Sequence, residues 1–296
     1  MMRQGLFTAL ITPFKNEGSE LDLDAFRKLV QRQVDAKVEG IVLMGTTGES
    51  ATVTLNERKQ LIKEAKKITQ GKVLLMAGCG TNDTLSTIEQ AKISEEAGAE
   101  ALQIVTPPYS KPSQEGLYLH FKAIHDSVQL PIFIYNIPGR TSVNMDVATI
   151  KRLFALERMA GIKEASGNMQ QLVDVIETLK GRPCTILAGD DSLALPAIAL
   201  GAHGVMSVLG NLLPKKMKAL VDAALMNDLQ KARSLHYELK SIMQACFVET
   251  NPVPIKYMLG KVLSLNDTVR LPLAPLTEKS RSLIDTTLSK NVNDDL

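Results

Sequence analysis

Short apolar runs alternate with amphipathic stretches along the first two thirds of the chain, and this alternation constrains the fold more than any other feature. The runs are nearly continuous in hydrophobicity, which is typical of strands covered on both faces of a parallel sheet. The eight runs are Leu6–Ile11, Gly40–Met44, Val73–Ala77, Ala101–Val105, Pro131–Tyr135, Ala160–Lys163, Thr185–Ala188 and Gly204–Val208. The stretches with helical spacing are Leu23–Val38, Leu55–Thr69, Thr84–Ala97, Glu115–Val128, Met145–Leu156 and Met169–Leu179.

This order, strand then helix throughout, predicts an α/β fold. A unit of roughly 30 residues repeated eight times is typical of a (β/α)8 TIM barrel, and a doubly wound open sheet is the alternative. From about Pro214 the pattern changes to helices joined by Pro-rich connections. We therefore predict a barrel over residues 1–217 and a C-terminal helical extension packed on it over residues 218–296. The helices expected after the eighth strand are Met217–Leu225, Leu229–Cys246, Ile255–Leu263 and Ser280–Leu288.

Glycines precede several of the expected strands, at positions where a helix should end. Gly98, Gly161, Gly181 and Gly201 each fall shortly before an apolar run. A left-handed residue commonly closes a helix, and glycine adopts that conformation without a steric penalty. We expect all four to terminate helices.

Composition and motifs exclude several classes of function. The 34 basic and 32 acidic side chains leave a net charge of +2, too little for a nucleic-acid-binding surface. No apolar run reaches the roughly 18 residues of a membrane span, and the N-terminus lacks the layout of a signal peptide. The three cysteines are far apart, which favours a reducing cytoplasm over a disulfide framework.

Cofactor and metal motifs are absent as well. Phosphate loops, dinucleotide fingerprints and nucleophile elbows are missing, and the four histidines lack the spacing of metal ligands. The pair Asp190–Asp191 fits either an acid pair or a helix cap, and we favour the cap. Neither nucleotide chemistry nor metal catalysis is indicated.

The loops at the C-terminal strand ends build the active site of a barrel of this type. Lys163 lies inside a predicted buried strand at such an end. A buried ammonium is costly, so the side chain either pairs with a carboxylate or loses its proton. Glu164 is adjacent, but a strand directs it to the opposite face. A neutral amine attacks carbonyl carbon and forms a Schiff base, and both alternatives stay open from the spacing alone.

Other strand-end residues also have a functional and a structural interpretation. Tyr135 can transfer protons beside the amine or simply pack as an amphipathic side chain. Arg140 has the planar fork that suits a carboxylate, although a lone arginine is more often a surface residue. The Thr46–Thr47 pair offers hydroxyls for a small carboxylate, and Tyr109 follows two prolines in a loop that can point toward another subunit or solvent.

Taken together, these strand ends resemble the dihydrodipicolinate synthase family of pyruvate-dependent class I aldolases. The wider superfamily, which includes N-acetylneuraminate lyase, shares the Gly45-Thr-Thr-Gly-Glu49 loop, the Tyr135 strand end and the Lys163 strand. The narrower signals are Tyr135–Thr141 and Lys111–Gly116, which look like the synthase rather than the sugar-acid lyases.

The resemblance implies a role for each site residue. Lys163 forms an imine with pyruvate, while Tyr135, Thr46 and Tyr109 relay protons, Tyr109 acting in the neighbouring subunit's site. Thr47 holds the pyruvate carboxylate, and Arg140 binds the carboxylate of L-aspartate 4-semialdehyde. The backbone carbonyl near Met206 lies close to the imine. The resemblance also implies that no metal or organic cofactor is needed. The family is usually a tetramer built from two tight dimers.

The chain departs from the lysine-inhibited branch of that family. Positions that carry polar effector ligands in that branch are Leu55, Arg58, Ser86 and Pro108 here, while Ser50, Ala51 and Asn82 match. An effector with two charged ends would leave its ammonium unpaired in such a pocket. We expect feedback inhibition by lysine to be weak or absent. The remaining alternatives are a sibling aldolase that takes a sugar-acid aldehyde and a non-catalytic barrel.

Overall fold

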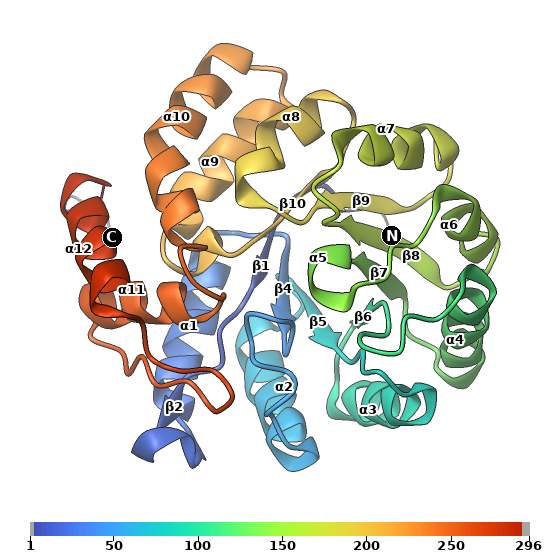
Figure 1. The fold of residues 1–296 in the computed structure, drawn as a ribbon, viewed down its shortest axis with the longest axis horizontal. Coiled ribbons are helices and arrows are strands. Elements are labelled where there is room, and N and C mark those ends of the chain that lie inside the picture. The colour runs from blue at the N-terminus through green and yellow to red at the C-terminus, as the bar shows by residue number, and fades with distance from the viewer. Residues whose placement is uncertain (1–2, 292–296) are drawn as a thin grey trace.

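The computed structural model describes residues 3–291 and contains a closed barrel of eight parallel strands (Figure 1). β1 pairs with both β4 and β10, so the sheet has no open edge. The TIM barrel is confirmed, and the doubly wound alternative is wrong. The barrel strands are β1 (Gly5–Ala9), β4 (Gly40–Leu43), β5 (Leu74–Gly78), β6 (Ala101–Val105), β7 (Ile132–Asn136), β8 (Met159–Glu164), β9 (Thr185–Ala188) and β10 (Gly204–Ser207).

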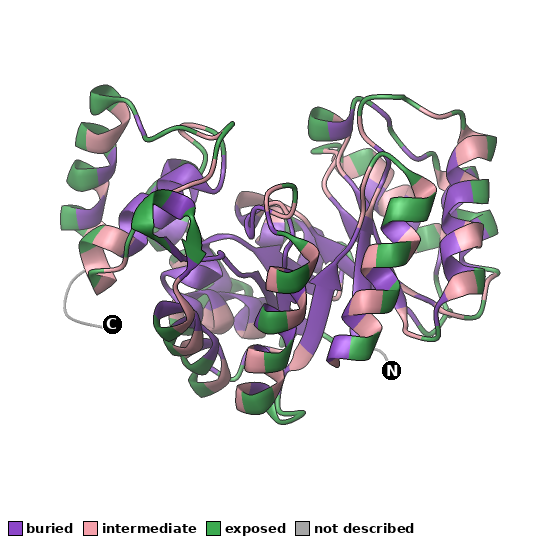
Figure 2. Cartoon of the chain, turned by 90° about the horizontal axis from the view of Figure 1, so that it is seen from below, coloured by how far each residue is buried: buried purple, intermediate pink, exposed green. Residues whose placement is uncertain are grey.

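Helices surround the barrel with their apolar sides against the strands, as the burial colours show in Figure 2. Their N-termini are capped by side chains such as Asp22, Thr54 and Asp83, which satisfy backbone N–H groups of the first turn. The surrounding helices are α1 (Leu23–Asp35), α2 (Leu55–Thr69), α3 (Thr84–Ala97), α4 (Gln114–Ser127), α6 (Val147–Leu153), α7 (Met169–Thr178), α8 (Ala194–Ala199) and α9 (Pro214–Leu225).

Several short elements and the helix α8 have no counterpart among the sequence predictions. Helix α8 is six residues long and contains Pro196, so it shows less than two turns of periodicity. The short elements all follow a barrel strand, so they lie at the C-terminal end of the barrel. They are β2 (Phe14–Lys15), η1 (Asn16–Gly18), β3 (Glu20–Leu21), α5 (Pro138–Thr141), η2 (Asp191–Leu193) and η3 (Leu209–Asn211).

Three helices follow the barrel: α10 (Leu229–Ala245), α11 (Val253–Leu263) and α12 (Glu278–Asn291). They lie together beside α1 and α9 in Figure 1. Helix α9 packs against β1 and β10 as the eighth barrel helix, so the predicted boundary at residue 217 falls within it. The division into 1–217 and 218–296 stays a prediction, and its residues 1–2 and 292–296 lie outside the described range.

The barrel interior is a separate apolar cluster from the layer between strands and helices. Phe7, Val42, Met76, Phe133 and Met206 belong to the interior cluster, and all are buried. This interior is packed rather than open, which leaves the strand ends as the place for a site.

The interior also explains one wrong prediction. Gly98, Gly181 and Gly201 have positive φ at or just after helix ends, as expected. Gly161 instead lies within β8, where an added Cβ would collide with the ring of Phe133. A glycine is therefore required at position 161 because the Phe133 ring packs against the strand there, and not because a helix ends there.

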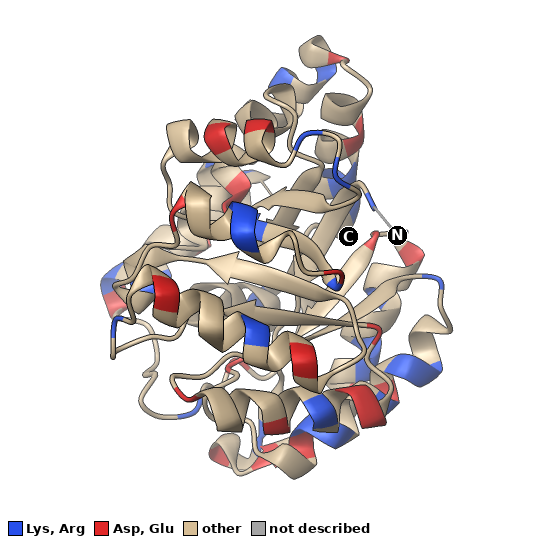
Figure 3. Cartoon of the chain, turned by 90° about the vertical axis from the view of Figure 1, so that its right-hand side faces the viewer, with Lys and Arg blue, Asp and Glu red and all other residues tan. Residues whose placement is uncertain are grey.

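The helical surface carries both signs of charge. Figure 3 shows Lys and Arg interspersed with Asp and Glu over one side of the molecule. Among residues 3–291, no helix has the length and apolar character required to cross a membrane.

Candidate active site

Two neighbouring strands bring Lys163 and Tyr135 together. The residues are partners in the parallel register of β7 and β8. Phe133, two positions before Tyr135, lies in the barrel interior, whereas Ile134 and Ile162 belong to the outer layer. The period of two therefore directs Tyr135 and Lys163 inward at the C-terminal end of the barrel. The Lys163 Nζ lies 4.3 Å from the centroid of the Tyr135 ring.

The Lys163 amine is buried without a charge partner. The residue is 5% exposed, and no carboxylate within residues 3–291 forms an ion pair with it. Glu164 points to the other face of the sheet, where it accepts hydrogen bonds from Asn136 Nδ2 at 3.0 Å and from the backbone N–H of Ser166 at 2.7 Å. The alternative of a lysine paired with an adjacent carboxylate is therefore not what the fold contains.

The loop after β4 brings two threonines to the same end of the barrel. Thr46 is half-buried and lines a small cavity of about 30 Å³ together with Ser50 and Tyr135. Thr47 is buried, and its Oγ1 accepts a hydrogen bond from Asn251 Nδ2 at 2.9 Å. The loop hydroxyls thus lie beside the phenol at one end and against the C-terminal extension at the other.

A larger cavity of about 440 Å³ opens next to these strand ends. It is lined by the exposed Arg140 of α5, by Ser166 after β8, by Gly189 after β9 and by Phe247 of the extension. The Arg140 guanidinium donates to the carbonyl of Asn251 at 3.4 Å. A guanidinium at the rim of a cavity of this size is suited to a carboxylate ligand.

Two predicted residues lie apart from this group. Tyr109 is 89% exposed on the loop after β6, with φ of 74°, so a single chain leaves its phenol at the surface. Met206 is buried inside the barrel, where its Sδ lies 2.7 Å from Gln103 Nε2. The structure therefore groups Lys163, Tyr135 and Thr46 directly and does not enclose Tyr109.

The Asp190–Asp191 pair has a structural role. The Asp190 carboxylate accepts from the backbone N–H of Ser192 and caps η2, as expected. Asp191 is buried and accepts from the backbone N–H groups of Val208 and Leu209, each at 2.9 Å. Burial raises the pKa of the Asp191 carboxyl. No group of three or more potential ligand side chains for a metal ion occurs in the described part of the chain.

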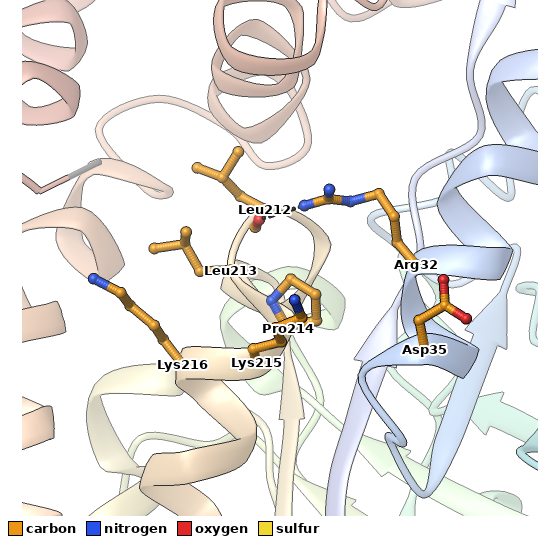
Figure 4. A pocket seen from close by; sticks show the side chains of 7 residues that line it. All are labelled: Arg32, Asp35, Leu212, Leu213, Pro214, Lys215 and Lys216. Atoms are coloured by element: carbon orange, nitrogen blue, oxygen red, sulfur yellow. Dashed lines mark hydrogen bonds between the residues drawn. The ribbon is translucent and has the colours of Figure 1, made fainter. Parts of the chain in front are cut away.

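A third cavity, of about 140 Å³, lies between α1 and the start of α9 (Figure 4). The Arg32 guanidinium donates to the carbonyl of Leu212 at 3.1 Å across it, and burial lowers the pKa of Arg32. None of the predicted site residues lines this cavity, so it does not belong to the strand-end site.

Comparison with known proteins places this geometry in a family. A sequence model of the Dihydrodipicolinate synthetase family matches residues 2–291. The chain belongs to this family. It is 46% identical over 280 residues to the 4-hydroxy-tetrahydrodipicolinate synthase of Protochlamydia amoebophila, covering 94% of this chain and 93% of that protein. It is 44% identical to the Wolinella succinogenes synthase, covering 96% of each chain.

Solved structures give the same assignment. The dihydrodipicolinate synthase of Thermotoga maritima has a TM-score of 0.95 and 39% identity, covering 98% of this chain and 99% of that one. As a member of the Dihydrodipicolinate synthetase family, the protein is a lyase of the class I aldolase type.

Two residues of this site were missed by the sequence analysis. A Cβ built on Gly189 would lie 2.4 Å from the Cβ of Ala165 and 3.1 Å from Lys163 Cε, so this glycine permits the close approach of the chain beside the lysine. Its signal was a glycine directly after a strand. Asn251 contacts both Thr47 and Arg140 but lies about 200 positions from Thr47 in sequence. No local pattern could have paired them.

Proposed function

We propose that this protein condenses pyruvate with L-aspartate 4-semialdehyde to give 4-hydroxy-tetrahydrodipicolinate, on the route through diaminopimelate to lysine. The observation that carries the proposal is the buried Lys163 amine without a carboxylate partner among the described residues, 4.3 Å from the Tyr135 ring. A buried lysine at a strand end with no carboxylate partner is placed to attack the keto carbon of a keto acid and form a Schiff base.

The first half of the reaction activates pyruvate. Lys163 Nζ attacks the keto carbon, one water leaves, and the resulting imine loses a methyl proton to give an enamine. Tyr135, Thr46 and a Tyr109 supplied by a second copy of the chain carry these protons. Thr47 binds the pyruvate carboxylate, and the backbone carbonyl of Met206 borders the imine. No organic cofactor or metal takes part in these steps.

The second half forms the carbon–carbon bond and releases the enzyme. The enamine carbon attacks the aldehyde of the second substrate, whose carboxylate Arg140 binds. The amine of that substrate then displaces Lys163 by cyclisation, which returns the lysine as a free amine. Arg140 lies at the rim of the cavity of about 440 Å³, which supports this assignment, because a guanidinium can donate two parallel hydrogen bonds to a carboxylate.

Borohydride reduction in the presence of pyruvate tests the covalent step. We expect mass spectrometry to find the added mass on the peptide that contains Lys163. An adduct on another peptide, or none, would contradict the proposal. A coupled assay that offers aspartate semialdehyde against N-acetylmannosamine or glyceraldehyde then separates the synthase from a sibling aldolase, since turnover of a sugar aldehyde alone would favour the sibling.

The assembly follows from the role given to Tyr109. We propose a cytoplasmic homotetramer built from two tight dimers, in which each Tyr109 serves the partner subunit's site. The 89% exposure of Tyr109 in a single chain supports this, because a phenol at the surface of one subunit is free to enter another. Sedimentation analysis of the protein and of Tyr109→Phe checks it. A fully active monomer would overturn it.

A further inference from the structure

The C-terminal extension reaches the Thr46–Thr47 loop through two buried polar contacts. One is the hydrogen bond from Asn251 to Thr47, in which Asn251 is 4% exposed. The other is an ion pair between the Lys256 ammonium of α11 and the Glu49 carboxylate, whose side chains are 0% and 1% exposed. Asn251 lies two residues before α11 and Lys256 lies in its first turns, so both contacts come from one short segment of the extension.

The Glu49 carboxylate lies at the centre of a closed polar network. Its Oε2 accepts from the backbone N–H of Arg270 at 2.9 Å, and Lys256 Nζ also donates to the carbonyl of Thr268 at 2.8 Å. The Phe14 ring lies beneath both cations, 4.2 Å from Lys256 Nζ and 4.1 Å from Arg270 Cζ. Each charge in this network therefore depends on its partners, because buried charges are tolerated only when paired.

The backbone of the loop depends on Glu49. Glu49 has φ of 53°, in the left-handed region that non-glycine residues rarely adopt. This conformation costs about 1 kcal/mol or more, so contacts outside the loop must maintain it. The Glu49 N–H donates to the carbonyl of Thr46 at 3.1 Å. A displacement of Glu49 would consequently move Thr46.

We propose that Lys256 is a positioning residue for the reaction: by holding the Glu49 carboxylate it fixes the hydroxyls of Thr46 and Thr47, although it touches no substrate. The inference rests on the proposed function, in which these threonines transfer protons and bind the pyruvate carboxylate. The extension thereby contributes to catalysis through the contact between Lys256 and Glu49, which are more than 200 residues apart in the sequence.

The test measures imine formation and steady-state kinetics of Lys256→Met in the intact protein. Misplacement of reacting groups by about 1 Å costs up to roughly a hundredfold in rate. We expect the rate of borohydride-trapped pyruvate adduct formation and kcat/KM for pyruvate to fall by roughly ten- to a hundredfold. The KM for aspartate semialdehyde should stay within about twofold, because Lys256 does not contact Arg140. Trapping at the wild-type rate would overturn the proposal.

Two controls separate positioning from general damage to the extension. Tyr257→Phe, the next residue on α11, removes the hydrogen bond from the phenol to Asp285 at 3.1 Å and leaves the loop untouched. Its pyruvate kinetics should equal those of the wild type. The double variant Lys256→Met with Glu49→Gln should be no slower than the slower single variant, because both substitutions remove the same ion pair. A combined loss equal to the product of the two single losses would contradict the proposal.

A folding failure of Lys256→Met leaves the inference testable. Glu49→Gln alone removes the ion pair from the loop side, and wild-type pyruvate kinetics in that variant would overturn the positioning role. The proposed function fails in a different way, since in that case the wild-type protein itself would form no adduct on Lys163. The two failures are distinguishable in one set of trapping experiments.

Discussion

Two lysines are buried against aromatic rings in this molecule, and their surroundings differ in one respect. Lys163 in β8 lies over Tyr135, and Lys256 in α11 lies over Phe14, at nearly equal distances of 4.3 and 4.2 Å. Lys256 has the Glu49 carboxylate and a backbone carbonyl as partners, whereas Lys163 has no carboxylate partner within residues 3–291. Under the proposed function only Lys163 reacts with substrate, so we attribute the difference between the two lysines to the counter-charge rather than to burial.

The presence or absence of a counter-charge predicts opposite effects on stability when each lysine is replaced. A paired charge leaves its partner unpaired and buried when it is replaced. Replacing an unpaired amine leaves no unpaired partner and removes the cost of burying the amine. The region around Lys163 should therefore be expendable for stability and essential for activity, and the region around Lys256 should contribute strongly to stability.

The largest expected effect is on the activity of Lys163→Met. The variant lacks the nucleophile, so we expect kcat to fall by roughly a thousandfold or more. Its free energy of unfolding should stay within about 1 kcal/mol of the wild type or exceed it, because an apolar side chain of similar length replaces a buried amine. Urea denaturation and the synthase assay measure both quantities. Full turnover would remove the distinction between the two lysines.

The stability of Lys256→Met gives the converse result. Breaking a buried pair costs about 3–5 kcal/mol, since Glu49 is left as an unpaired buried charge. Urea denaturation of this variant beside Lys163→Met checks the expectation. Equal unfolding free energies for the two variants would show that the ion pair does not distinguish the regions.

His120 is a buried base outside both lysine regions, and its contribution to the stability of the protein should depend on pH. His120 is 6% exposed, and burial lowers its pKa from 6.5 to about 4, with the Asp83 carboxylate opposing the shift. The unfolded chain takes up the proton first, so the contribution of His120 to stability is complete above pH 6.5 and is lost as the pH falls toward 4. The loss amounts to about 3 kcal/mol. His120→Gln should lack it, and parallel stability profiles for the two proteins would contradict this.

Tyr135→Phe sharpens the comparison because it keeps the ring under Lys163 and removes only the hydroxyl. A positioned proton-transfer group contributes about a hundredfold or more to rate. We expect kcat to fall by roughly a hundredfold, while the free energy of unfolding changes by less than about 1 kcal/mol. Near wild-type kcat would show that the ring acts only by packing. Phe14 has no hydroxyl, so the Lys256 region contains no equivalent group.

The smallest expected effect concerns a third buried cation. Arg58 is 0% exposed and donates to the carbonyl of Gly78 at 2.7 Å and to Gln90 Oε1 at 2.9 Å, so its guanidinium is already paired with neutral acceptors. The resemblance assigns Leu55 and Pro108 to the same expected effector pocket, and both are apolar, so lysine should find few polar partners there. We expect sub-millimolar lysine to leave the rate unchanged. Clear inhibition in that range would contradict the expectation.

Much of the barrel could be predicted because its signals are local. Runs such as Ala101–Val105 and Thr185–Ala188 match β6 and β9, since a strand buried on both faces is apolar throughout its length. Gly161 was misinterpreted as a helix end, because a glycine needed for the Phe133 ring looks the same in sequence as one needed for a turn. Helix α8 was missed, because six residues are too few to show a helical period.

Local patterns were enough to predict the order of strands and helices and the position of Lys163 at a strand end. Continuous apolar runs and a helical period of about 3.6 residues are visible in neighbouring residues and need no tertiary information. The counter-charge of a buried lysine could not be predicted in this way, because Glu49 and Lys256 meet through the packing of the extension on the closed barrel. A contact across about 200 residues depends on how separate elements pack, and no local pattern encodes it.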